Sequence, residues 1–308
     1  MKVLIKNATI ISSLHANSPT DILIENGFIT EIQPGITINA DKIVEKQNLH
    51  VSAGWMDFFA NFCDPGDEYK ETLESGAKAA AASGFTEVML IPNTSPIVYN
   101  KSQVEYIVQK SKNLQVKIHP IGAITKNAEG RELNEIYDMQ NSGAIGFSDG
   151  INSLQSSGIM LKALEYVKTF SGTIIQMPDD KNIGINGLMN EGIISTKLGL
   201  PGKPAIAEEI LIARDIELLK YTGSRLHFTG ISTKKSLELI QAAKKEGLNI
   251  SCSVTPYHLF FCDEDLWDYD TNLKVNPPLR TRNDMFALRE GLKKGAIDFI
   301  SSHHQPHD

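Results

Sequence analysis

The sequence predicts an α/β protein: a (β/α)8 barrel of the TIM type, preceded by a small β-sandwich unit. Short apolar runs alternate with amphipathic segments from Gly54 onward, eight of the first kind and seven of the second. Such alternation implies a parallel sheet, and eight strands are the number that closes a barrel. The first fifty residues instead hold β-branched runs and turn residues without a helical pattern. An open doubly wound sheet is the alternative, but eight units exceed most open sheets.

The N-terminal part is expected to form a small sheet without helices. Its apolar runs cover residues 3–5, 22–24, 29–32 and 42–44. Asn26-Gly27 separates two of these runs and predicts a hairpin, and Asn17 is a further turn signal. We assign residues 1–53 to this β-rich sandwich unit and residues 54–308 to the barrel.

The barrel elements follow from the same alternation. The expected strands are residues 55–62, 86–92, 116–124, 144–149, 173–177, 225–232, 249–255 and 298–302. The expected helices are residues 70–83, 102–112, 132–142, 159–170, 205–221, 234–246 and 284–294. Glycines placed to adopt a left-handed C-terminal cap follow six of them: Gly84, Gly143, Gly172, Gly223, Gly247 and Gly295. Asn283 is the expected N-cap of the last helix.

No eighth helix follows the eighth strand, since the sequence ends at Asp308. We expect an apolar surface at Ile297 and Phe299 for that reason. The sequence is therefore expected to be a fragment without the last part of the fold, or to have this edge covered by something else.

Composition excludes several classes of protein. The 30 basic and 37 acidic residues give a formal net charge of −7, whereas a nucleic-acid-binding protein is usually basic. No run of about 18 apolar residues predicts a membrane span, and the N-terminus lacks a signal-peptide pattern. The three cysteines form no disulfide framework, so we expect a reduced, cytoplasmic protein without nucleic-acid or membrane partners.

Polar motifs follow the predicted strands, where a barrel collects its active site. They are Asp64-Pro65-Gly66, Tyr69-Lys70-Glu71-Thr72, Pro92-Asn93-Thr94, Gly146-Phe147-Ser148-Asp149, Ser232-Thr233, Val254-Thr255-Pro256, Asn276-Pro277-Pro278-Leu279-Arg280 and Pro306-His307. With these motifs the chain resembles dihydroorotases of the amidohydrolase superfamily over essentially its whole length. The resemblance implies a metal-dependent barrel that interconverts N-carbamoyl-aspartate and dihydroorotate in pyrimidine biosynthesis. It also implies one or two zinc ions, which activate a water and polarise the amide carbonyl.

The resemblance locates the metal ligands of the family, and most are replaced here. The family has a His-x-His pair on strand one, a carboxylate on strand four, single histidines on strands five and six, and an aspartate base on strand eight. The residues at these positions are Phe59, Asn61, Asp149, Met177, Gly230 and His303. Only Asp149 matches in kind, and zinc usually needs three or four protein ligands. We therefore expect no bound zinc, and His303 at the aspartate position is expected to be a poor catalytic base.

The substrate-binding positions are partly kept. The family's carboxylate-binding arginine corresponds to Cys63, whereas Asn93, Asn276 and His307 match other substrate-contacting positions. The first hypothesis is a non-catalytic homologue or subunit, with aspartate carbamoyltransferase or a second copy of the chain as partner. The third is a pyrimidine-like ligand-binding module, which would take a small pyrimidine precursor.

An active cyclic amidohydrolase is the second hypothesis, ranked before the ligand-binding module. It would need an unusual or mononuclear metal site built from Asp149, His303, His307 and His258. Adjacent residues of an extended strand point to opposite faces, so His303 and His304 are not expected to enter one site.

Overall fold

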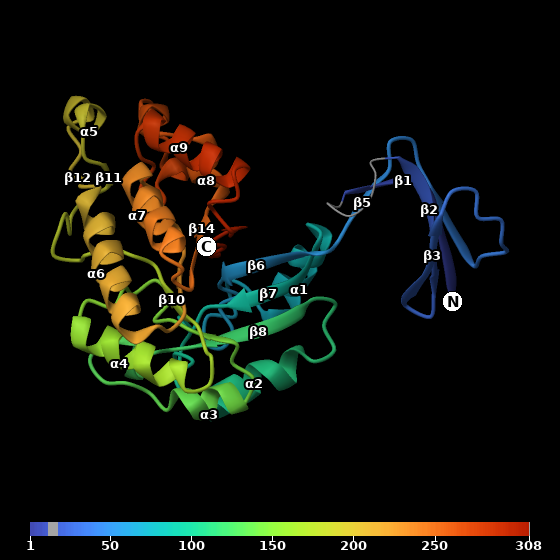
Figure 1. The fold of residues 1–308 in the computed structure, drawn as a ribbon, viewed down its shortest axis with the longest axis horizontal. Helices are drawn as coiled ribbons and strands as arrows, with labels where there is room; N and C mark the ends of the chain where they lie inside the picture. Colours follow the sequence, from blue (N-terminus) through green and yellow to red (C-terminus); the bar gives the residue numbers. More distant parts are fainter. Residues whose placement is uncertain (12–17, 308) are drawn as a thin grey trace. The chain divides into compact units, whose positions relative to one another are not determined.

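The computed structural model describes residues 1–11 and 18–307. The chain divides into two compact units, Met1–Trp55 and Met56–Asp308. Each is described separately, and Figure 1 shows the elements of both.

The N-terminal unit is a five-stranded sheet without a helix in its described part. Its strands are β1 (Lys2–Ile11), β2 (Pro19–Glu25), β3 (Phe28–Gln33), β4 (Lys42–Glu45) and β5 (His50–Ser52). The predicted hairpin is confirmed, because β2 and β3 are antiparallel and Asn26 and Gly27 join them with φ of 53° and 85°. Two positive φ values are typical of a type I′ turn. The turn expected at Asn17 lies outside the described residues.

The second unit is a nearly closed barrel of eight strands, as predicted. They are β6 (Trp55–Ala60), β7 (Phe85–Leu90), β8 (Lys117–Gly122), β9 (Gly146–Phe147), β10 (Ile174–Gln176), β13 (Leu226–Phe228), β14 (Ile250–Val254) and β15 (Phe299–Ile300). The order in the sheet follows the chain from β6 to β15, and each of the strand pairs β7–β8, β10–β13 and β14–β15 is parallel.

Side chains close the seam between β6 and β15. The Asp57 carboxylate on β6 accepts hydrogen bonds from the Ser301 hydroxyl and the Ser302 amide, both at 3.0 Å. The rings of Phe58 and Phe299 lie 4.2 Å apart between centroids. These contacts hold together two strands that share no ladder.

All seven predicted helices form around the strands (Figure 1). They are α1 (Leu73–Ala82), α2 (Lys101–Ser111), α3 (Ile136–Asn141), α4 (Ser157–Lys168), α6 (Ile206–Thr222), α7 (Lys234–Lys245) and α9 (Arg282–Lys293). Two caps were predicted wrongly. Ser171 rather than Gly172 adopts the left-handed conformation, with φ of 58°. Thr281 rather than Asn283 caps α9, because its hydroxyl accepts from the Asp284 amide.

Several short elements were not predicted. They are α5 (Ile193–Leu198), α8 (Pro256–Phe260), the paired strands β11 (Met189–Asn190) and β12 (Gly202–Lys203), and the 3-10 turns Lys126–Ala128, Asp263–Leu266 and Thr271–Leu273. Each spans six residues or fewer, which is too short for a hydrophobic period to show.

The barrel strands carry two separate layers of side chains. Alternate residues such as Val88 and Leu90 pack in the large cluster shared with the helices. Their neighbours Met89 and Ile91 form an inner cluster with Phe59, Ile121 and Ile175. This alternation is the period of a strand that is buried on both faces.

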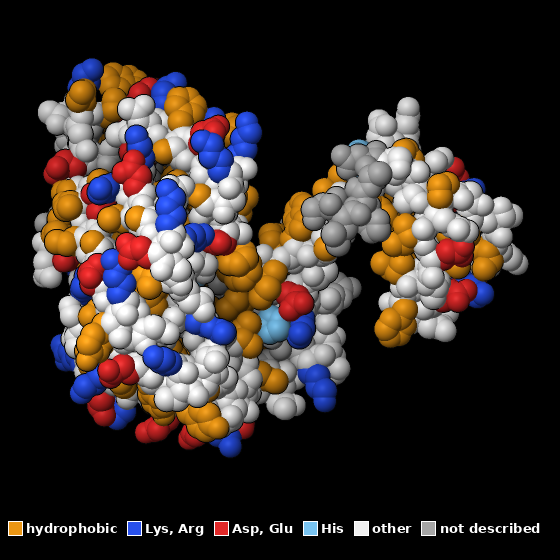
Figure 2. Space-filling view, viewed as in Figure 1, with side chains coloured by type: hydrophobic (Ala, Val, Ile, Leu, Met, Phe, Trp, Pro, Cys, Tyr) orange, Lys and Arg blue, Asp and Glu red, His pale blue; other side chains and the backbone are white. Residues whose placement is uncertain are grey.

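The surface expected at the eighth strand is only partly apolar. Ile297 is buried, which contradicts the expectation, because it packs against Gly291 of α9. Phe299 is exposed, as expected, and so is its neighbour Ile300. Elsewhere Figure 2 shows acidic and basic side chains interspersed over the visible face of the barrel. Among the described helices, none is both long and apolar enough to cross a membrane.

Candidate functional site

A cavity of about 820 Å³ opens where the barrel strands end at their carboxyl termini. Its lining includes Phe59 from β6, Met177 after β10, Thr255 after β14 and His303 after β15. The ends of parallel strands meet at one side of a barrel, which is why residues so far apart in sequence share this mouth.

Apolar side chains take up one side of the cavity. Phe59 and Met177 are 2% and 3% exposed, and both occupy positions where the resemblance placed a histidine ligand. The Phe59 ring lies 4.7 Å from the His303 ring, centroid to centroid. Neither side chain offers a nitrogen or oxygen to a metal ion.

The conformation at Gly230 brings His303 close to the backbone. Gly230 has φ of +68°, and a Cβ built on it would lie 2.6 Å from Cε1 of His303. The position therefore has no metal ligand and no room for one while His303 keeps its place. The His303 Nε2 atom lies 2.8 Å from the Thr229 hydroxyl.

Asp149 is held by a neighbouring loop. One carboxylate oxygen accepts from the Thr125 amide at 2.9 Å, and the other accepts from the Thr125 hydroxyl at 2.5 Å. Burial raises the pKa of Asp149 to about 6, although the hydrogen bonds from Thr125 act in the opposite direction. Asp149 is the one residue that keeps the ligand type of the family, and both of its carboxylate oxygens thus accept hydrogen bonds within the protein.

Asn61, Cys63 and Asn93 form a buried link between loops rather than a wall of the cavity. The Asn61 side chain accepts from the Cys63 amide at 2.8 Å and donates to the Asn93 carbonyl at 3.1 Å. Asn93 donates to the Asp149 carbonyl at 3.2 Å and accepts from the Ile151 amide at 3.0 Å. None of the three predicted site residues lines the cavity.

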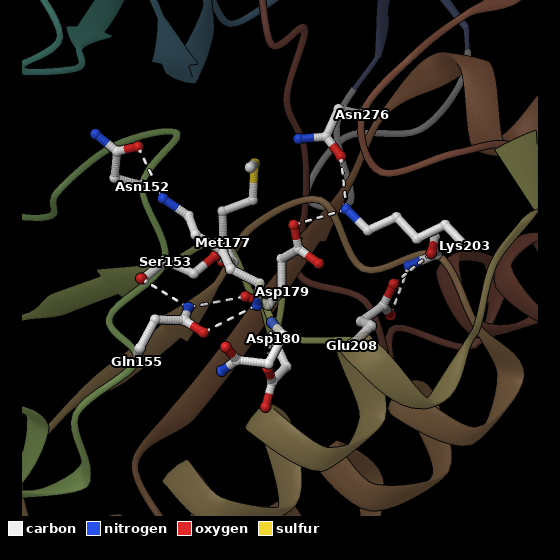
Figure 3. Close-up of polar contacts among 12 residues, drawn as sticks. Asn152, Ser153, Gln155, Met177, Asp179, Asp180, Lys203, Glu208 and Asn276 are labelled. Atoms are coloured by element: carbon white, nitrogen blue, oxygen red, sulfur yellow. Dashed lines mark hydrogen bonds and ion pairs between the residues drawn. The ribbon is translucent and has the colours of Figure 1, made fainter. Parts of the chain in front are cut away.

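Asn276 and His307 do line the cavity, and both are exposed. Figure 3 shows the Lys203 ammonium between the Asp179 carboxylate and the Asn276 amide oxygen, at 2.6 and 3.4 Å. Lys203 was not among the predicted site residues. It lies on β12, a short strand that the sequence did not reveal.

Two further histidines lie at the mouth and make hydrogen bonds within the protein. His258 is buried between the Thr255 hydroxyl at 2.7 Å and the Pro277 carbonyl at 3.0 Å, and burial lowers its pKa to about 4. His304 pairs with Glu71 at 2.7 Å. The expectation that an extended strand keeps His303 and His304 apart does not apply, since β15 ends at Ile300. Both residues line the cavity.

These residues do not fit a zinc centre. Within residues 1–11 and 18–307, no three His, Cys, Asp or Glu side chains lie close enough together to hold a metal ion. Of the six positions implied by the resemblance, Phe59, Met177 and Gly230 have no suitable donor, and the Asp149 oxygens bond to Thr125. Zinc sites in proteins need three or four such donors in one place.

Comparison with known proteins identifies close relatives in sequence. A family model described as dihydro-orotase-like matches residues 50–236. A dihydroorotase of Acetivibrio thermocellus is 43% identical over 307 residues, which is 99% of this chain and 72% of the relative. A dihydroorotase of Caldanaerobacter subterraneus is 42% identical over 308 residues, which is 100% of this chain and 72% of the relative.

Solved structures match the fold. An L-hydantoinase from Arthrobacter aurescens superposes with a TM-score of 0.83 at 24% identity, over 99% of this chain and 69% of that one. A D-hydantoinase from Thermus sp. gives a TM-score of 0.74 at 20% identity, over 99% and 69%. At such identities the likeness supports the architecture alone.

Proposed function

The chain belongs to the dihydro-orotase-like family, and we propose that it is a non-catalytic member of it. The relatives named dihydroorotase make a hydrolase the starting expectation. Amide hydrolysis of the kind that the resemblance implies depends on a metal ion, which supplies the nucleophilic water and polarises the carbonyl. The proposal is that this chain keeps the barrel and the mouth cavity without that chemistry.

The observation that carries the proposal is the environment of Asp149 and Gly230. The only carboxylate at an expected ligand position bonds through both oxygens to Thr125. At Gly230 the glycine is packed against the His303 ring, so no side chain of that position reaches the cavity. His303 also replaces the family's aspartate base, and its Nε2 atom lies 2.8 Å from the Thr229 hydroxyl.

Turnover tests the proposal. The purified chain is incubated with dihydroorotate and, separately, with N-carbamoyl-aspartate in the presence of added zinc. The Acetivibrio thermocellus dihydroorotase serves as a positive control. We expect no interconversion above the uncatalysed rate. Hydrolysis that is abolished by Asp149→Asn would refute the proposal and favour the unusual or mononuclear metal site.

A ligand-binding role is favoured by the cavity itself. Its volume of about 820 Å³ is within the range of small-molecule sites, and Asn276 and His307 line it. Assembly with aspartate carbamoyltransferase and a cytoplasmic location stay predictions. Co-elution of the two purified proteins from a sizing column would support the partnership, and separate elution at micromolar concentration would count against it.

A further inference from the structure

The mouth cavity is rich in hydrogen-bond donors and poor in negative charge. Among its described lining residues there is no Asp or Glu, although the whole chain has a net charge of −7. The nitrogen-bearing side chains of that lining are Asn272, Lys274, Asn276, His258, His303, His304, Gln305 and His307. Such a lining does not attract a cation.

A buried relay of hydrogen bonds ends at His303. The strand period places His227 and Thr229 on the same face as Ser251 and Ser253 of the neighbouring strand. His227 lies between the hydroxyls of Ser251 and Ser253, at 2.8 and 3.0 Å. The Ser253 hydroxyl donates to Thr229 Oγ1 at 3.0 Å, and Thr229 Oγ1 lies 2.8 Å from His303 Nε2.

The direction of the Ser253–Thr229 bond indicates the direction of the others. Because Ser253 donates to Thr229, its own oxygen is left to accept from His227 Nε2–H. His227 Nδ1 then accepts from Ser251. The Thr229 hydroxyl proton then has His303 Nε2 as its acceptor, because none of the other contacts of this hydroxyl among the described residues offers one. Neutral His303 therefore carries its proton on Nδ1, for which the described residues provide no acceptor.

Two further observations agree with a cavity that presents hydrogen-bond donors. Burial lowers the pKa of His303 to about 4, so the ring is neutral at physiological pH. Asn276 accepts from Lys203 through its side-chain oxygen, which turns its amide nitrogen away from Lys203, as Figure 3 shows. The Lys203 charge is balanced by Asp179, whereas Lys274 has no such partner among the described residues.

We propose that His303, held by this relay as an Nδ1–H donor, makes the mouth cavity selective for small ligands that present an anionic oxygen. The aspartate expected here from the resemblance would accept hydrogen bonds and attract cations. His303 reverses both preferences. Thr229 is the positioning residue, since it fills Nε2 and so determines which ring nitrogen keeps the proton.

The tautomer is measured directly on the full chain labelled with ¹⁵N-histidine. Two-bond proton–nitrogen spectra distinguish protonated from bare ring nitrogens, and a His303→Asn variant identifies the His303 signals. We expect His303 with Nδ1 protonated and Nε2 bare at neutral pH. A ring protonated on Nε2 would overturn the proposal, because Thr229 would then accept from His303 instead of donating to it.

Ligand selectivity is tested with malonate, inorganic phosphate and 1,3-diaminopropane. We expect the His303 signals to move with malonate or phosphate, the two arms separating carboxylate from phosphate ligands, and not with the diamine. No shift with either anion, or an equal shift with the diamine, would overturn the proposal. Both measurements are made on the parent chain, and the His303→Asn variant serves only to assign the His303 signals.

Substitution of the positioning residue adds a second readout. Thr229→Val removes the hydroxyl at nearly constant shape, and we expect binding of the preferred anion to weaken about tenfold, the loss of one hydrogen bond to a charged group. Thr229→Ser keeps the hydroxyl and is expected to restore both the tautomer and the affinity. Equal affinity of the Val and Ser variants would contradict the role of Thr229.

The inference rests on the proposed function in one respect, because it takes the cavity to be without zinc. The non-catalytic proposal and the relay proposal are refuted by different results. Turnover of dihydroorotate refutes the non-catalytic proposal, whereas the tautomer of His303 and its response to anions refute or support the relay alone.

Discussion

The contact between Thr125 and Asp149 tests whether the carboxylate at the family's ligand position is held by hydrogen bonds within the protein. Thr125→Val removes a hydroxyl that donates to the Asp149 carboxylate at 2.5 Å and accepts from the Gly130 amide at 2.8 Å. Thr125 and Asp149 are both buried, at 0% and 2% exposure, so water does not replace the lost bonds.

The expected cost follows from those two bonds. A hydrogen bond to a charged group contributes about 1.5–3 kcal/mol, and an ordinary one about 1 kcal/mol. We therefore expect Thr125→Val to lower the free energy of unfolding by about 3 kcal/mol at pH 7. Thr125→Ser, which keeps the hydroxyl, is the matched control and is expected to lose much less.

The pH dependence has a definite sign. Asp149 has a pKa of about 6 in the folded chain against 3.8 for the free side chain. The folded state therefore binds the Asp149 proton more tightly than the unfolded state does. The resulting contribution to the free energy of unfolding is fully present below pH 3.8 and is lost as the pH rises through 6. We expect a gain of about 1 kcal/mol from this group between pH 7 and pH 5, absent in Asp149→Asn.

The assay is urea unfolding followed by circular dichroism at both pH values. Protonation weakens the bond from Thr125, so the cost of Thr125→Val is expected to be smaller at pH 5 than at pH 7. A cost below about 1 kcal/mol at pH 7, or one that grows on acidification, would show that Thr125 does not hold the Asp149 carboxylate.

Three further substitutions test the packing around the mouth by the same unfolding assay. Gly150→Ala is expected to lower the free energy of unfolding by more than about 2 kcal/mol. The reason is that Gly150 has φ of +64° and a Cβ there would lie 1.6 Å from Asn93 Oδ1. An unchanged midpoint of urea unfolding would contradict this. Lys110→Met removes the ammonium group that lies 2.7 Å from the buried Asp64 carboxylate. We expect it to lower the free energy of unfolding by about 2–3 kcal/mol, and an unchanged free energy would mean that the pair does not stabilise the fold. Phe59→Ala opens a cavity at a residue that is 2% exposed, and we expect the free energy of unfolding to fall by about 3–4 kcal/mol. A loss below about 1 kcal/mol would show that the ring is not tightly packed at the position of the expected histidine ligand.

The architecture was predictable because strands and helices of this barrel have strong periods. The eight strands and seven predicted helices lie within a few residues of their expected bounds. The segment that carries Lys203 was missed, because β11, β12 and α5 are too short to show a period and are held by tertiary contacts. Ser171 took the place expected for Gly172 for a similar reason, since cap geometry depends on the turn that follows.

The site was only partly predictable. Sequence motifs located Asn276, His303 and His307 at the mouth, and the structure brings them to one cavity. They did not show that Asn93 is engaged by the loop after Asp149. The relay was also missed, although His227 and Thr229 alternate on one strand, because its partners belong to a neighbouring strand whose register the sequence does not reveal.

Zinc content tests the central claim most directly. The chain is produced in zinc-supplemented medium, freed of loose ions by gel filtration, and analysed by inductively coupled plasma mass spectrometry beside the Acetivibrio thermocellus dihydroorotase. The account predicts far less than one zinc ion per chain. One or two ions per chain, lost in Asp149→Asn, would contradict it.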